Sequence, residues 1–182
     1  MTFPTVENSL LVAVDLQQKL VPAMCAPEPT VSRSALMVRA AAELGVDIAV
    51  TEQYPKGLGN TIPDIATWLP DHARIMDKTS FSVFGCEAFR TFLSARKRSV
   101  LIFIGVEAHV CVLQSVLDAL AAGYEVIVVA DAVNSRRADD REQALATARM
   151  AGATVVNSET VIFMLLRDAK NPHFKAISAL VK

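Results

Sequence analysis

The sequence is poor in three features that mark whole classes of protein: cysteine, long apolar runs, and an excess of one charge. Its three cysteines, at positions 25, 86 and 111, are an odd number without metal-ligand spacing. This pattern argues against a disulfide framework and favours a reducing, cytoplasmic location. The 182 residues carry a formal net charge of −1, so we expect no binding to nucleic acid or to an anionic membrane.

Other absences narrow the class further. No apolar run approaches the roughly 18 residues that span a bilayer. The N-terminus lacks a basic segment, and residues 10–14 run straight into Asp15, which is typical of a strand rather than a signal peptide. No glycine-rich phosphate loop follows an expected strand, and the histidines show no helical pairing. We therefore expect no nucleotide cofactor and no metal.

What the sequence has in excess is apolar side chain. Hydrophobic residues make up 52% of the chain and charged residues 20%. A chain of this length fits one domain, which we expect to cover residues 1–182. The apolar surplus exceeds what a small monomer needs, and this predicts a homo-oligomer.

Short β-branched runs alternate with segments of helical periodicity along most of the chain. We expect strands at 10–15, 46–51, 73–78, 99–104, 125–131 and 154–157. We expect helices at 32–44, 86–95, 110–120, 139–151, 158–166 and 173–180, several of them ended by glycine. This alternation predicts an α/β protein, a three-layer αβα sandwich around a parallel sheet. Residues 17–29 and 52–71, which are rich in proline, are expected to be loops.

Three chemically useful side chains follow expected strands, so all three should lie at one edge of the sheet. Cys111 comes at the start of a helix, where the helix dipole favours a thiolate. Asp15 supplies a base for the thiol, and Lys78 supplies a cation that would hold Asp15 ionised. Each also has an ordinary interpretation: a packed apolar thiol, a turn or helix-cap carboxylate and an exposed ammonium.

Other residues near this edge are weaker candidates. His109 is an alternative base, but its position two residues before Cys111 directs the side chain to another face. Gln53, Tyr54, Phe81 and Phe84 are candidate substrate-binding residues, although aromatic side chains belong to the core more often than to a ligand site.

Five segments, in this order, resemble the isochorismatase-like hydrolases over most of the chain, from Leu10 to Asn157. They are Asp15, then 51–59 (TEQYPKGLG), 78–84 (KTSFSVF), 105–111 (GVEAHVC) and 131–136 (DAVNSR). Within that superfamily the sequence is most similar to the small isochorismatase-domain proteins, whose substrates are poorly defined. The resemblance implies a six-stranded parallel sheet of order 3-2-1-4-5-6.

The resemblance also implies a catalytic triad of Asp15, Lys78 and Cys111. It implies a cis peptide at Val106–Glu107, which would aim backbone N–H groups, of Glu107 or Ala108 and of Cys111, at an oxyanion.

Two departures from relatives refine the expected chemistry. Nicotinamidases of this superfamily carry an Asp-x-His metal motif after the second strand, where this chain has Gln53 and Pro55. True isochorismatases lack the nucleophilic cysteine, so Cys111 favours acyl chemistry. The sequence therefore predicts a metal-independent cysteine hydrolase of a small amide, acting through a thioester. A vinyl-ether hydrolase with Asp15 as the acid, and a non-catalytic assembly or redox-responsive binding protein, stay open as alternatives.

Overall fold

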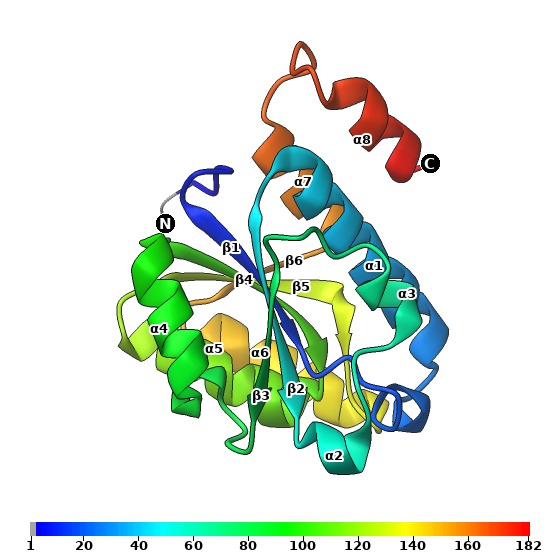
Figure 1. Ribbon diagram of the computed structural model, residues 1–182, viewed down its shortest axis with the longest axis vertical. Helices are drawn as coiled ribbons and strands as arrows, with labels where there is room; N and C mark the ends of the chain where they lie inside the picture. The colour runs from blue at the N-terminus through cyan, green and yellow to red at the C-terminus, as the bar shows by residue number, and fades with distance from the viewer. Residues whose placement is uncertain (1–2) are drawn as a thin grey trace.

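Six parallel strands form one sheet in the computed structural model, which describes residues 3–182 (Figure 1). The strand order is β3-β2-β1-β4-β5-β6, which confirms the order 3-2-1-4-5-6. The strands are β1 (Ser9–Val14), β2 (Asp47–Gln53), β3 (Arg74–Lys78), β4 (Val100–Val106), β5 (Glu125–Asn134) and β6 (Thr154–Val156). Because all of them run in parallel, their carboxyl ends share one edge, the edge at which α2 lies in Figure 1.

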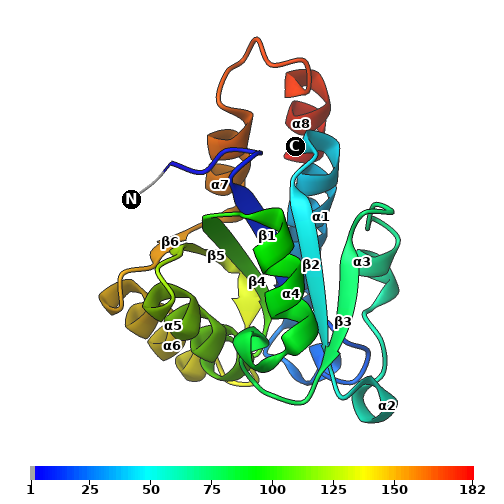
Figure 2. The same cartoon turned by 60° about the vertical axis from the view of Figure 1, so that its left-hand side comes forward.

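Helices cover both faces of this sheet (Figures 1 and 2). They are α1 (Pro27–Leu44), α2 (Pro55–Leu58), α3 (Pro63–Ala66), α4 (Glu87–Arg96), α5 (Leu113–Ala121), α6 (Ala138–Met150), α7 (Ser158–Leu166) and α8 (Phe174–Leu180). Two 3-10 turns, η1 (Val21–Ala23) and η2 (Val83–Gly85), and a π-helical turn, η3 (Ala108–Val112), complete the described elements. Among residues 3–182 no helix is long and apolar enough to cross a membrane.

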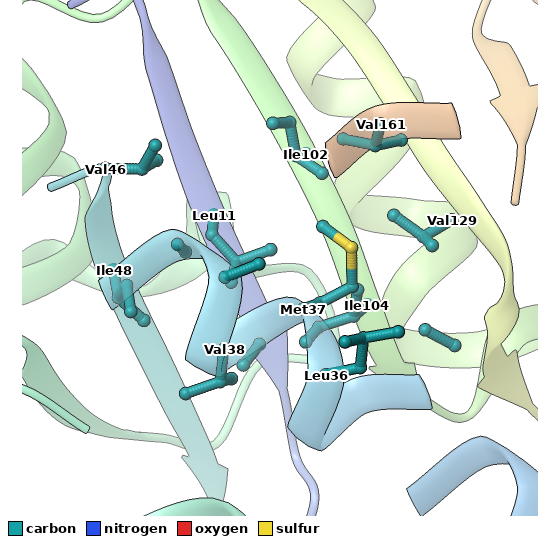
Figure 3. Packing of buried hydrophobic residues seen from close by; sticks show 14 of the residues in the cluster. Leu11, Leu36, Met37, Val38, Val46, Ile48, Ile102, Ile104, Val129 and Val161 are labelled. Atoms are coloured by element: carbon teal, nitrogen blue, oxygen red, sulfur yellow. The ribbon is translucent and has the colours of Figure 1, made fainter. Parts of the chain in front are cut away.

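The two faces of the sheet carry separate apolar cores. On one face α1, α3, α7 and α8 pack on alternate residues of the central strands, for example Met37 of α1 beside Ile104 of β4 (Figure 3). On the other face α4, α5 and α6 cover the remaining residues, among them Phe89 and Phe103. Every residue of β1 and β4 is buried, as expected for strands covered on both sides.

Strands β1 and β4 approach each other closely at Gly105, which pairs with Val14 in the sheet. Gly105 has φ of +114°, and a Cβ atom there would overlap the carbonyl oxygen of Val14. The pairing of β4 with β5 also shifts its register between Phe103 and Gly105. Only glycine fits this position, which lies at the point where β4 leads into the turn that carries Cys111.

The structure corrects two expectations about the loops. Helix α1 begins at Pro27, several residues before the expected start. Proline is compatible with the first turn of a helix, because the N–H groups there make no hydrogen bond within the helix and the missing N–H of proline costs nothing. The segment 52–71 contains the end of β2 and the short helices α2 and α3, each of which also starts at a proline.

Candidate functional site

Asp15 leaves strand β1 in a left-handed conformation, with φ of +52°. Its backbone N–H still donates to the carbonyl oxygen of Thr51 in β2, at 3.0 Å. Its Oδ1 accepts the hydroxyl of Thr51 at 2.8 Å, and its Oδ2 accepts Lys78 Nζ at 2.7 Å. Non-glycine residues with positive φ are uncommon and gather at functional sites. This carboxylate thus lies across the end of β2, with a partner on each of the next two strands.

Lys78 ends strand β3, and its side chain and that of Asp15 are both 0% exposed. Besides Asp15, its ammonium donates to Gln53 Oε1 at 2.6 Å and to the carbonyl oxygen of Ser80 at 3.2 Å. Three acceptors therefore match the three N–H donors of the ammonium. The pair is a fully buried and fully hydrogen-bonded ion pair, the only arrangement in which such charges are tolerated away from water.

Cys111 lies in the π-helical turn η3, which follows β4 and leads into α5. Its side chain packs in the core on the α4, α5 and α6 face, and the residue is 6% exposed. The hydroxyl of Ser115 donates to the carbonyl oxygen of Cys111 at 2.6 Å and accepts the N–H of Val83 at 3.0 Å. This buried serine fixes the cysteine turn to the η2 turn.

The thiol interacts electrostatically with both charged groups of the site. Burial raises the pKa of Cys111, and the negative charge of Asp15 raises it further, to about 12, against a smaller lowering by Lys78. Burial also raises the pKa of Asp15, while Lys78, Thr51 and Cys111 act in the opposite direction. The pKa of Cys111 is therefore shifted in the direction opposite to the one expected from the helix start, because burial and the adjacent carboxylate disfavour the thiolate. Burial thus favours the neutral thiol of Cys111, while the ion pair with Lys78 favours the ionised form of Asp15.

The turn before Cys111 contains a cis peptide bond between Val106 and Glu107. Glu107 accepts the guanidinium of Arg136 at 2.8 Å. His109 directs its Nδ1 to the hydroxyl of Ser135 at 2.9 Å, so its ring is engaged away from Cys111. These contacts attach the turn to the end of β5 and to the residues that follow it.

A hollow of about 960 Å³ lies against β3, α2 and the start of α4, and Lys78 is among its lining residues. Of the four candidate substrate-binding residues, Tyr54 lines this hollow and is 57% exposed. Gln53 contacts Lys78 instead, and Phe84 packs edge-on against Phe89 with its ring centroid 5.6 Å away. Phe81 is exposed and is not a lining residue of the hollow. Asp15 and Cys111 do not line it either.

Two other carboxylates, Glu52 within the end of β2 and Asp131 within β5, have separate structural roles. Glu52 accepts the N–H and hydroxyl of Thr61, which fixes the loop after β2. Asp131 accepts the N–H and hydroxyl of Ser158 at the start of α7. Neither contacts the Asp15–Lys78 pair.

Sequence reasoning missed three residues that hold the site together: Thr51, Ser115 and Gln17. Each is a neutral polar residue within or beside an apolar segment, and each is fully buried. Gln17, two residues after Asp15, donates to the carbonyl oxygens of Gln53 and Gly59. A buried polar residue must find hydrogen-bond partners. A neutral polar residue within or beside an apolar run was therefore the sequence signal that could have identified these three residues.

The fold and this edge of the sheet define an α/β protein with its polar site beyond the carboxyl ends of parallel strands. The family model described as "Isochorismatase domain" matches residues 9–160. "Isochorismatase domain-containing protein 2A" of Mus musculus is 40% identical over 178 residues, which cover 97% of this chain and 84% of that protein. The chain belongs to the isochorismatase family.

Solved structures agree with this assignment. The MAR1 ribonuclease of Caenorhabditis elegans superimposes with a TM-score of 0.94 at 37% identity, covering 99% of this chain and 92% of that chain. YcaC of Pseudomonas aeruginosa, described with hexane-2,5-diol and covalent acrylamide, gives a TM-score of 0.91 at 25% identity, covering 99% of this chain and 93% of that chain.

Proposed function

We propose that this protein is a cysteine hydrolase that cleaves a small amide without a metal, through a thioester on Cys111. The observation that carries the proposal is the buried ion pair in which Lys78 Nζ lies 2.7 Å from Asp15 Oδ2. The charge of the same carboxylate acts on the thiol of Cys111 and raises its pKa. A buried ion pair is weak as a source of stability. Perturbed titratable groups gathered at the carboxyl edge of a parallel sheet are typical of catalytic sites.

The reaction has two halves. Asp15 takes the proton of Cys111, and the sulfur attacks the carbonyl carbon to form a C–S bond. We assign stabilisation of the tetrahedral oxyanion to backbone N–H groups of the turn around Val106, Glu107 and Ala108. Protonated Asp15 then gives its proton to the leaving amine as the C–N bond breaks.

In the second half, Asp15 takes a proton from water, which attacks the thioester. The C–S bond then breaks and releases the carboxylic acid, and protonated Asp15 returns its proton to the sulfur. Lys78 keeps one full positive charge beside the carboxylate throughout. Each step thus moves one proton between groups already present in the site.

The covalent acrylamide described for YcaC supports a nucleophile in this fold that attacks an electrophile carrying an amide. We infer that the substrate is a small amide whose apolar part lies in the hollow beside Lys78. Met76, Phe92 and the ring of Tyr54 give that hollow much of its apolar lining. We also infer assembly into a homo-oligomer, because Ile75 within β3, Phe81 after β3 and Tyr54 after β2 expose large apolar side chains.

A screen of small amides with Cys111→Ala and Asp15→Asn as controls tests the proposal. Both variants should lose turnover while their far-UV circular dichroism and melting temperature stay close to those of the parent. Retained cleavage of a vinyl ether by Cys111→Ala would instead identify Asp15 as an acid acting alone.

The name of the Caenorhabditis elegans neighbour makes RNA a further substrate to include in that screen. The net charge of −1 disfavours it, because RNA binding draws most of its affinity from basic residues. Cleavage of RNA that survives Cys111→Ala would show an activity that does not use the thiol.

A further inference from the structure

Gln53 is the last residue of β2, and its side chain is engaged within the protein at both ends. Oε1 accepts Lys78 Nζ at 2.6 Å, and Nε2 donates to the carbonyl oxygen of Thr79 at 2.8 Å. The contact with Lys78 is as short as the ion pair between Lys78 and Asp15. A side chain held in this way acts directly on the ammonium.

The backbone of Gln53 is fixed in turn by the side chain of Gln17. Gln53 N–H donates to Gln17 Oε1 at 2.7 Å, and Gln17 Nε2 donates to the Gln53 carbonyl oxygen at 3.0 Å. Gln17 is 0% exposed and also donates to Gly59 at 2.6 Å. Because β1 leaves the extended conformation at Asp15, the Gln17 amide replaces the missing peptide partner of β2 at this point.

Gln53 differs from the other strong partner of the ammonium in having no charge. Gln53 Oε1 accepts one N–H of the Lys78 ammonium. Without this acceptor, the ammonium would be freer to move away from the carboxylate of Asp15. A carboxylate in the same place would share the positive charge of Lys78 with Asp15 and add a second negative charge beside Cys111. The neutral amide thus fixes the direction of the ammonium without competing for its charge.

We propose that Gln53 is a positioning residue of the triad, which, supported by Gln17, holds the Lys78 ammonium on Asp15 and leaves Asp15 the sole anion of the resting site. This inference rests on the proposed function, because it assigns a role in setting the ionisation of the base. It extends that function to a residue that contacts neither the thiol nor, in this scheme, the substrate.

The test compares Gln53→Glu, which keeps size and acceptor but adds a charge, with Gln53→Met, which keeps size and removes the acceptor. In both variants the acid limb of the pH profile of kcat/KM should move up by about one pH unit, since Asp15 loses part of the stabilisation from Lys78. kcat should fall more than KM rises. Gln143→Glu is the control variant, because it adds the same charge at an exposed position of α6 outside the described site. It should leave the pH profile of kcat/KM unchanged.

A second readout does not need a known substrate. Alkylation of Cys111 by iodoacetamide, followed by peptide-resolved mass spectrometry, should slow about tenfold at pH 8 in Gln53→Glu, because one unit of thiol pKa changes the thiolate fraction tenfold. A folded Gln53→Glu with the parent's profile and alkylation rate would overturn the proposal. If Gln53→Glu does not fold, an acid limb of the kcat/KM profile that stays at the parent's pH in Gln53→Met would overturn the proposal instead.

The two proposals fail separately. If Asp15→Asn leaves both turnover and Cys111 alkylation as in the parent, the triad itself is wrong. If Asp15→Asn changes them and neither Gln53 variant does, the triad stands and only the positioning role of Gln53 is wrong.

Discussion

Replacing Asp15 by asparagine should make Cys111 more reactive toward a simple electrophile while strongly lowering turnover. The negative charge of Asp15 raises the pKa of the thiol, whereas Lys78 lowers it. Asparagine has nearly the same shape and can still accept from Thr51 and Lys78. The variant therefore keeps the buried ammonium but removes the anion that opposes a thiolate.

The magnitude follows from the charges. At an effective dielectric constant of about 20, two unit charges about 4 Å apart interact by roughly 4 kcal/mol, which is almost three pKa units. Side-chain and solvent relaxation reduce this value, so we expect alkylation of Cys111 at pH 8 to rise at least about tenfold. Turnover should fall by roughly 10²–10⁴, the usual contribution of a general acid or base.

Iodoacetamide labelling with peptide-resolved mass spectrometry measures the first effect, and the exposed thiol of Cys25 serves as an internal reference in every sample. Asp77→Asn is the matched control, because it removes an exposed carboxylate one residue before Lys78 and should change the rate less than twofold. Slower alkylation in Asp15→Asn would refute the electrostatic reasoning, since it would mean that Asp15 already activates the thiol in the resting protein.

Two further predictions concern stability. Lys78→Met leaves the carboxylate of Asp15 buried without a counterion and should lower the free energy of unfolding by about 3–5 kcal/mol. The double variant Asp15→Leu with Lys78→Met should recover most of this stability. Urea unfolding measures both variants, and equal stability of the single and double variants would contradict this account. Gly105→Ala should prevent folding at 37 °C because its Cβ meets the carbonyl oxygen of Val14, whereas Gly123→Ala, with positive φ but open space, should cost only about 1 kcal/mol. Similar melting temperatures for the two glycine variants would refute the steric argument.

The alternation of strands and helices and the residues at the carboxyl edge of the sheet could be predicted because both follow from features that are local in sequence. Apolar runs such as residues 100–104 mark buried strands, and helix-ending glycines such as Gly45 mark where helices stop. In a parallel sheet, Asp15 and Lys78 each follow or end a strand, so one topology brings them together. The resemblance to a known family then supplied the strand order itself.

The partners and the ionisation of the site could not be predicted in the same way. The hydrogen bonds of Thr51 to Asp15 and of Gln17 to Gln53 each join residues 36 positions apart. The pKa of Cys111 depends on burial and on a carboxylate from another strand, neither of which its own helix reveals. A local argument from the helix dipole consequently gave the wrong direction.

A thiol pKa of about 12 does not oppose the proposed mechanism, because the proton of Cys111 goes to Asp15 and not to water. Before the transfer the site holds a carboxylate, an ammonium and a neutral thiol; afterwards it holds a neutral carboxylic acid, an ammonium and a thiolate. The net charge is zero in both states, so the burial that raises both pKa values penalises the two states similarly. Only the difference between the two pKa values sets the cost of transfer. Lys78, which faces an anion in either state, is what allows a buried aspartate to serve as the base.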